Sequence, residues 1–131
     1  MDLEKIREEF RKDRFASCQA GAVVDDAREG FSRCSMEIKP HHLNGIGRVM
    51  GGAVFTLADF AIAVLSNSGG RKTVSLSSSI SFLGAAKGKR LIAEAKCIKN
   101  GKTICVYEAV VKDELGTLVA LVTAESFVLN N

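Results

Sequence analysis

The chain has 131 residues, of which 47% are apolar, and its 18 Lys and Arg against 15 Asp and Glu leave a formal net charge of +3. This length and apolar content are typical of one domain, residues 1–131, with a core of its own. The weak, scattered positive charge shows no basic–aromatic interleaving, which argues against a nucleic-acid partner. The longest apolar run, residues 53–65, is shorter than the ~20 residues of a membrane span, and the charged N-terminus has no signal-peptide pattern. We therefore expect a cytoplasmic protein without a membrane partner.

The order of the predicted elements defines the fold class. Apolar residues at helical spacing predict a helix over residues 2–14, followed by strands over 20–26 and 31–38. A glycine-rich loop, 41–50, leads into an apolar helix over about 51–66, and alternating segments then predict strands over 73–83, 90–99, 102–112 and 117–129. Strands joined by short turns form antiparallel sheets, and a helix that is apolar nearly all round must be covered. We expect an α+β fold in which the sheet wraps around the long central helix.

The four cysteines show no CxxC spacing, which argues against a zinc or redox site. Cys97 and Cys105 flank Asn100-Gly101, a dipeptide typical of a two-residue hairpin turn. In that register the two sulfurs point to opposite faces of the sheet and cannot form a disulfide. We expect free, mostly buried thiols in a reducing compartment.

Serines dominate the strand expected over residues 73–83. Strict alternation places the odd-numbered ones on one face, where they line a polar pocket or meet solvent. These residues are Ser75, Ser77, Ser79 and Ser81.

The start of the apolar helix favours negative charge. Asn44 and several glycines precede it, and backbone N–H groups at a helix start have no intrahelical partner. Gly51 and Gly52 either allow close packing or leave an N–H unobstructed, so that it donates to a carbonyl oxygen that becomes an oxyanion.

Asp59 is the one carboxylate inside this apolar helix. Such an acid is either satisfied by nearby N–H or basic groups, or it has a chemical task, because desolvation raises its pKa and makes it a better base or nucleophile. Gly51 and Asp59 are eight residues apart, which is roughly 12 Å along a helix, whereas catalytic groups act at about 3 Å. If both act on one carbonyl, they belong to different chains, and the protein is at least a dimer with two composite sites.

Three segments carry a resemblance to a known family: HLNGIGRVMGGAVFTLAD (42–59), VSLSSSISFLGAAKGKRLIAEA (74–95) and KNGKTICVYEAVVKDELGTLVA (99–120). They resemble the PaaI-like group of hotdog-fold acyl-CoA thioesterases. The resemblance implies a hotdog fold, a homodimer that often pairs into a homotetramer, and hydrolysis of an acyl-CoA to free acid and CoA with no metal or other cofactor.

The resemblance also implies roles for single residues. Asp59 matches the acid that attacks the thioester or activates water, and Gly51 matches the glycine whose N–H polarises the thioester carbonyl. Asn44 matches an Asn that places the carbonyl or the water, and Ser75 matches a serine that orients water. Asp59 and Ser75 would come from one subunit, and Asn44 and Gly51 from its partner.

Met50 departs from the family pattern, which usually reads His-Gly-Gly where this chain reads Met50-Gly51-Gly52. Met cannot donate a hydrogen bond, so Met50 keeps open a non-catalytic acyl-CoA-binding protein, a sensor or carrier. Met50, Gly52 and His42 are the expected substrate contacts.

A hotdog dehydratase is a weaker alternative, because that chemistry usually needs an Asp–His pair. Candidate partners for the CoA phosphates are Arg71, Lys72, Lys87, Lys89 and Arg90.

Overall fold

The computed structural model describes residues 2–68 and 70–129. Its helices are α1 (Leu3–Phe10), a π-helical turn η1 (Phe15–Gln19), a 3-10 turn η2 (Pro40–His42) and α2 (Gly51–Asn67). Its strands are β1 (Val23–Arg28), β2 (Phe31–Glu37), β3 (Thr73–Phe82), β4 (Arg90–Asn100), β5 (Ile104–Asp113) and β6 (Leu118–Val128).

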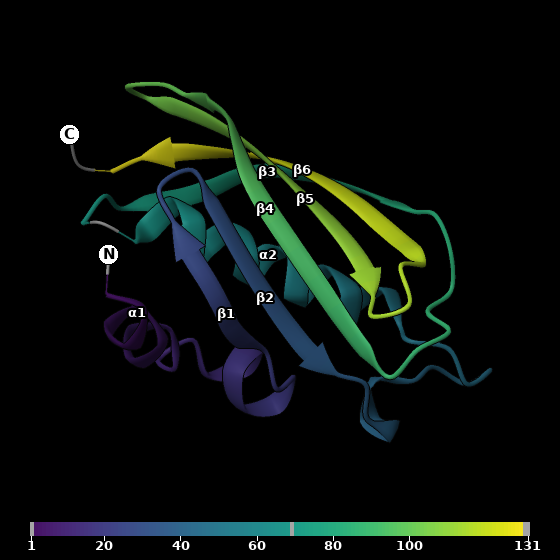
Figure 1. Cartoon of the computed structure of the whole chain (residues 1–131). Coiled ribbons are helices and arrows are strands. Elements are labelled where there is room, and N and C mark those ends of the chain that lie inside the picture. The colour runs from purple at the N-terminus through teal and green to yellow at the C-terminus, as the bar shows by residue number, and fades with distance from the viewer. Residues whose placement is uncertain (1, 69, 130–131) are drawn as a thin grey trace.

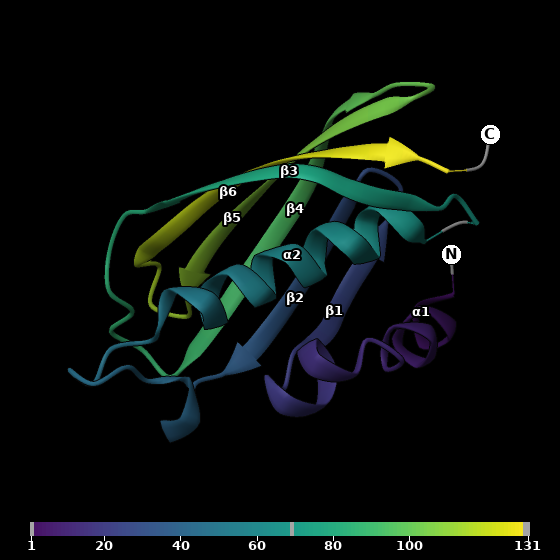
Figure 2. The same cartoon turned by 180° about the vertical axis from the view of Figure 1, so that it is seen from behind.

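The six strands form one antiparallel sheet in the order β1-β2-β4-β5-β6-β3. The sheet curves around α2, which crosses its concave face (Figure 1). Figure 2 shows α1 beside β1, whereas β3 forms the opposite edge. This arrangement confirms the predicted α+β fold with a central helix. Within the described ranges, no helix is long and apolar enough to cross a membrane.

The core lies between α2 and the inner face of the sheet. Leu57, Ala58, Ala61 and Val64 of the helix are fully buried. The strand residues opposite them are mostly small, because alanines alternate along the three central strands, and small side chains let a helix lie close to a sheet. These alanines are Ala93, Ala95, Ala109, Ala120 and Ala124.

The N-terminal helix is shorter than the predicted range of residues 2–14. It ends at Phe10, and the N–H groups of Lys12 and Asp13 turn back to the carbonyls of Glu9 and Phe10. The chain then forms η1, which the sequence pattern did not predict. The charged residues that follow Phe10 continue a helical charge pattern, but they supply no further apolar residue to hold another turn against the core.

Two histidines hold the end of this N-terminal segment. His42 is buried; its Nδ1 accepts a hydrogen bond from the N–H of Lys39, so its Nε2 carries the proton and donates to the carbonyl of Ala20 at 2.8 Å. Nε2 of the exposed His41 lies 3.0 Å from the carbonyl of Gln19. Both rings therefore fix the segment before β1 to the loop before α2.

The predicted register of the β4–β5 hairpin is wrong. Asn100 pairs with Cys105, and the turn is longer than the two residues expected. A two-residue Asn-Gly turn needs positive φ at both residues, but neither Asn100 nor Gly101 has it. Gly101 is required for another reason: a Cβ there would lie 2.1 Å from the carbonyl oxygen of Ile104.

The corrected register also changes the orientation of the cysteines. Cys97 pairs with Tyr107, which lies two positions from Cys105 on β5, so both thiols point to the inner face instead of opposite faces. Both are free thiols, and burial, followed by the nearby Cys105, raises the pKa of Cys97.

A β-bulge at Leu76 corrects the predicted face of the β3 serines. Ser75 pairs with the buried Ser126, but the register shifts between Ser75 and Ser77, which pairs with the exposed Glu125. Cross-strand partners share a face, so Ser75 faces the helix whereas Ser77 faces away from it. The predicted set of odd-numbered serines is therefore divided between the two faces of the sheet.

Two carboxylates fasten the loop that connects β3 to β4. Asp113 accepts hydrogen bonds from the N–H groups of Lys87 at 2.8 Å and Gly88 at 3.0 Å, and also from those of Leu115 and Thr117. Glu114 accepts the N–H groups of Lys89 and Arg90. These two carboxylates, the Asp113–Glu114 clamp, hold the end of the β3–β4 loop, whose first residues lie beside the start of α2.

Candidate active site

The loop before α2 presents Asn44 at the surface. The N–H of Asn44 donates to the carbonyl of Arg48, and its side-chain Oδ1 accepts the N–H groups of Ile46 and Arg48, each at 3.1 Å. Gly47 has a φ of 78°, which closes the turn. These bonds occupy the amide oxygen of Asn44 and hold its NH₂ group as a donor on a rigid loop.

The start of α2 has unpaired donors. Met50 is the N-cap residue but makes no side-chain cap hydrogen bond, and the N–H groups of Ala53 and Val54 donate to its carbonyl. Within residues 2–68 and 70–129, the N–H groups of Gly51 and Gly52 donate to no protein atom. The macrodipole of a 17-residue helix adds positive potential at this end, so the position suits an oxyanion.

Asn44 and Gly51 line the same cavity. Its volume is about 520 Å³, and Arg48, Phe82 and Leu83 contribute to its wall. The structure thus brings together two of the four predicted catalytic residues within one chain.

Phe82 covers one side of the helix start, which the sequence analysis missed. A Cβ placed on Gly51 would lie 2.8 Å from Cζ of Phe82, so the ring lies directly against the Cα of this glycine. Phe82 is 57% exposed and, like Ile80, faces the helix layer. Alternation with Ile80 gives this side for Phe82, but its contact with Gly51, 31 residues earlier, exists only in three dimensions.

Met50 lies beside Gly52. Its Cε would be 3.4 Å from a Cβ on Gly52, and its side chain is 48% exposed. This position, which is usually histidine in the family, is therefore open enough to hold an imidazole ring.

Asp59 lies further along α2 and is half-buried. Burial, and then the negative charge of Asp13, raises its pKa. Its carboxylate makes no hydrogen bond or ion pair with any residue that the structure describes. Within one chain, none of the described residues supplies a donor to Asp59. Asp13, which the sequence analysis did not consider, belongs to the turn after α1 and approaches Asp59 only in three dimensions.

Asp59 and Ser75 are not part of the Asn44–Gly51 cavity. Ser75 is exposed on the edge strand β3 and faces the helix layer. One chain therefore holds Asn44 with Gly51 in one place, and Asp59 and Ser75 elsewhere. His42 does not join either group, because both of its ring nitrogens are engaged by backbone groups.

Two of the expected phosphate-binding cations have structural contacts. Arg71 donates to the side chain of Asn100 and to the carbonyl of Gly101, and Arg90 donates to Ser35. Lys87 and Lys89 are exposed on the loop that continues from the Asn44–Gly51 cavity. Among the described residues, no group of three or more His, Cys, Asp or Glu side chains is placed to hold a metal ion.

A curved antiparallel sheet around one long helix is the architecture of the hotdog fold. The unpaired N–H donors at the helix start and the unpaired acid within the helix are its candidate site. Comparison with known proteins agrees with this fold. The family model of the thioesterase superfamily matches residues 46–120.

Two proteins of known structure are similar over most of the chain. The acyl-coenzyme A thioesterase PaaI of Escherichia coli is 34% identical over 107 residues, which are 81% of this chain and 76% of that protein. The structure of E. coli PaaI superimposes with a TM-score of 0.88 at 26% identity over 99% of this chain and 98% of that one. A hypothetical thioesterase from Streptococcus pneumoniae, solved with coenzyme A, gives a TM-score of 0.85 at 27% identity over 93% and 98%. That protein has also been solved with a threonine, and separately an aspartate, replaced by alanine.

The chain belongs to the thioesterase superfamily, in its PaaI-like hotdog group. Its general activity is therefore the hydrolysis of thioesters.

Proposed function

We propose that the chain, as a single hotdog domain of residues 1–131, hydrolyses an acyl-CoA thioester to the free acid and CoA. The observation that carries this proposal is the Asp59 carboxylate, which lies in an apolar helix with a raised pKa and without a partner among the described residues. An acid in that state is poised to take a proton from water or to attack a carbonyl carbon.

The remaining groups have complementary roles in this proposal. The N–H of Gly51, with that of Gly52 beside it, donates to the thioester carbonyl and stabilises the oxyanion as the tetrahedral intermediate forms. The NH₂ group of Asn44 places the carbonyl or the attacking water. Ser75 orients water beside Asp59. The thiolate of CoA then leaves, and the acyl group departs as a carboxylic acid.

Related proteins support the substrate and the acid. The E. coli relative is an acyl-coenzyme A thioesterase, and the S. pneumoniae structure contains coenzyme A. In the S. pneumoniae protein, the replaced aspartate and threonine have the same separation in sequence as Asp59 and Ser75. Threonine and serine share the hydroxyl that this role requires. The same substrates favour a cytoplasmic location.

The edge strand β3 supports a homodimer. It has ten residues without a charge or a proline, and Val74, Leu76 and Phe82 are between 45% and 57% exposed. Unpaired N–H and C=O groups along an uncharged edge strand pair readily with another strand. We propose that β3 pairs with β3 of a second copy, that Asn44 and Gly51 of one copy thereby face Asp59 and Ser75 of the other, and that two such dimers form a tetramer.

The test is CoA release from a panel of acyl-CoA thioesters, followed with a thiol reagent. Cys18 is exposed, so the reaction of the protein alone is subtracted. We expect turnover by the wild type, and a kcat that is about 10²-fold or more lower in Asp59→Asn with KM little changed. Since burial raises the pKa of Asp59, the acidic limb of the rate profile should lie above the ordinary aspartate value of about 3.9.

The control is Asp26→Asn, which removes a surface carboxylate paired with Arg28 and should leave turnover unchanged. Full turnover by Asp59→Asn would contradict the assigned site. Acyl-CoA binding without turnover by the wild type would instead support the acyl-CoA sensor or carrier that Met50 keeps open.

A further inference from the structure

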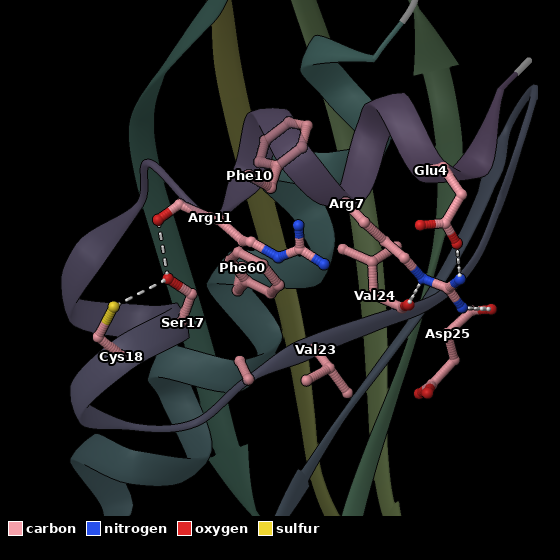
Figure 3. A pocket seen from close by; sticks show the side chains of 11 residues that line it. Glu4, Arg7, Phe10, Arg11, Ser17, Cys18, Val23, Val24, Asp25 and Phe60 are labelled. Atoms are coloured by element: carbon pink, nitrogen blue, oxygen red, sulfur yellow. Dashed lines mark hydrogen bonds and ion pairs between the residues drawn. The ribbon is translucent and has the colours of Figure 1, made fainter.

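A second cavity lies away from the Asn44–Gly51 cavity. Its volume is about 570 Å³, and it lies between α1, the π-helical turn η1 and β1, with Phe60 of α2 at its base. Figure 3 shows the side chains that line it. Cavities of about 300–1,000 Å³ are the usual size for small-molecule ligands.

The cavity has an apolar wall. Phe10 and Phe60 meet edge to face with their ring centroids 6.1 Å apart. Ala22, Val23 and Val24 of the segment that enters β1 complete this side. An apolar group of a ligand can therefore leave water against these side chains, which is favourable at about 25 cal/mol per Å² of buried area.

Four charged residues line the cavity, and two of them, Arg7 and Glu4, are paired with each other. Arg7 donates Nε to the carbonyl of Val24 at 2.8 Å and Nη2 to the carbonyl of Asp25, and its Nη1 is paired with the carboxylate of Glu4 at 2.5 Å. The carboxylate of Asp25 points away from the guanidinium groups (Figure 3).

Arg11 is the charged residue that extends into the cavity. In Figure 3 its guanidinium extends into the cavity between Phe60 and Arg7. Its side chain makes no hydrogen bond, ion pair or ring contact with residues 2–68 or 70–129. Arg11 therefore places an unpaired positive charge inside the cavity, and a guanidinium binds a carboxylate through two parallel hydrogen bonds.

We propose that this cavity binds an amphipathic carboxylate, with its carboxylate on Arg11 and its apolar tail against Phe10 and Phe60. This site goes beyond the proposed hydrolysis, and it contains none of the four proposed catalytic residues. The acid that a thioesterase releases has this chemistry. Because Phe60 follows Asp59 on α2, an occupant of this cavity contacts the helix next to the proposed catalytic acid.

Cys18 gives a direct readout of occupancy. It lines the cavity and is exposed, whereas Cys34 and Cys105 are fully buried and Cys97 is half-buried. The experiment measures the rate of Cys18 alkylation by iodoacetamide at fixed pH, located by peptide mass spectrometry. Octanoate is the probe, octanol is the uncharged chain of the same length, and inorganic phosphate is an anion without a tail. Calorimetric titration with octanoate gives the affinity independently.

The matched variants are Arg11→Gln and Arg14→Gln. Each removes one arginine from the same segment, but Arg14 is not part of the cavity. We expect octanoate to slow Cys18 alkylation in the wild type and in Arg14→Gln, and to bind about tenfold or more weakly to Arg11→Gln. Octanol and phosphate at the same concentration should give no protection.

Equal protection by octanol would show an apolar cavity without anion recognition, and protection by phosphate would show an anion site that needs no tail. Either result, an unchanged affinity in Arg11→Gln, or no binding of octanoate to the wild type overturns the proposal. Thermal unfolding of both variants verifies that they fold. Since the assay does not use a thioester, it is independent of the proposed hydrolysis.

Discussion

Asp59 differs from the paired acids of this chain in what surrounds it. Asp113 and Glu114 accept several backbone N–H groups, and surface acids such as Glu108 pair with a cation. Asp59 is half-buried without either kind of partner among the described residues. The sequence indicated this residue because one charge inside an apolar helix is unusual. It could not indicate Asp13, whose proximity depends on the turn after α1.

Met50 gives a residue-scale prediction. Replacing Met50 by His restores a hydrogen-bond donor beside Gly52, where the half-exposed Met50 side chain leaves room. We expect Met50→His to raise kcat for acyl-CoA up to about tenfold, the effect of one hydrogen bond formed in the transition state. Steady-state kinetics over the acyl-CoA panel measures this.

Met50→Leu is the control for this prediction, since it keeps an apolar side chain of similar volume and should match the wild type. If Met50→His turns over more slowly than Met50→Leu, the site has adapted to methionine and the expectation is wrong.

At the scale of elements, apolar patterning predicted the helix that begins at Gly51 and the succession of the strands along the chain. The pattern is decisive there because most of the 17 residues of α2 are apolar and the helix ends at the polar residues Ser66 and Asn67. It failed at the end of α1 and in the β4–β5 hairpin. Both depend on local backbone geometry: a tightened turn after Phe10 in one case, and the absence of positive φ at Asn100 and Gly101 in the other.

The edge of β3 gives an element-scale prediction. Ser79 lies on its outer face opposite Thr123 of β6. A lysine at position 79 places a like charge near its counterpart when two copies of β3 pair, and lysine is a common guard of edge strands. We expect Ser79→Lys to shift the protein toward the monomer in light scattering and to lower thioesterase activity in parallel.

Thr123→Lys is the matched control, because it adds the same charge to the same face one strand further in. It should keep the oligomer and the activity. Loss of the oligomer in both variants would mean that the face of the sheet, and not the edge of β3, holds the copies together.

The clamp at Asp113 predicts a pH-dependent stability. Burial alone would raise the pKa of this carboxylate, but the N–H groups of Lys87, Thr117 and Gly88 outweigh it and hold the pKa well below its usual range. A lowered pKa in the folded state means that the stabilisation is complete above the unfolded value of about 3.9 and is lost progressively as the pH falls from there toward the folded-state pKa. We expect Asp113→Asn to lower the Tm by several degrees at pH 7.

The same comparison near pH 3 should give a smaller difference between Asp113→Asn and the wild type. A difference in Tm that does not change between pH 7 and pH 3 would show that the loop depends on the shape of this side chain and not on its charge.

At the scale of the whole molecule, the proposed site requires two chains. The helix spacing of Gly51 and Asp59 led to this expectation, and the structure groups Asn44 with Gly51 in a cavity that excludes Asp59 and Ser75. The resemblance supplied the chemistry, which no spacing could supply. The role of Phe82 was not predicted, because its contact with Gly51 exists only in the folded chain.

Mixed dimers test the composite site. Asn44→Ala and Asp59→Ala are each expected to be inactive, but a dimer with one chain of each kind contains one complete site. Random mixing gives hetero- and homodimers in equal amounts, so we expect about a quarter of the wild-type activity after the two variants are refolded together. Activity that stays at the level of the separate variants would place the whole site within one chain.

The bulge at Leu76 reverses the alternation of inward- and outward-facing residues along β3. Before it, Ser75 faces the helix; after it, Phe82 also faces the helix, although strict alternation would put the two on opposite sides. One strand can therefore serve both halves of the proposed site, with a hydroxyl for the half that holds Asp59 and an aromatic wall for the half that holds Gly51. Without Leu76, Ser75 and Phe82 would lie on opposite faces of the sheet. A relative that lacks this extra residue must therefore supply either the hydroxyl or the aromatic wall from another segment.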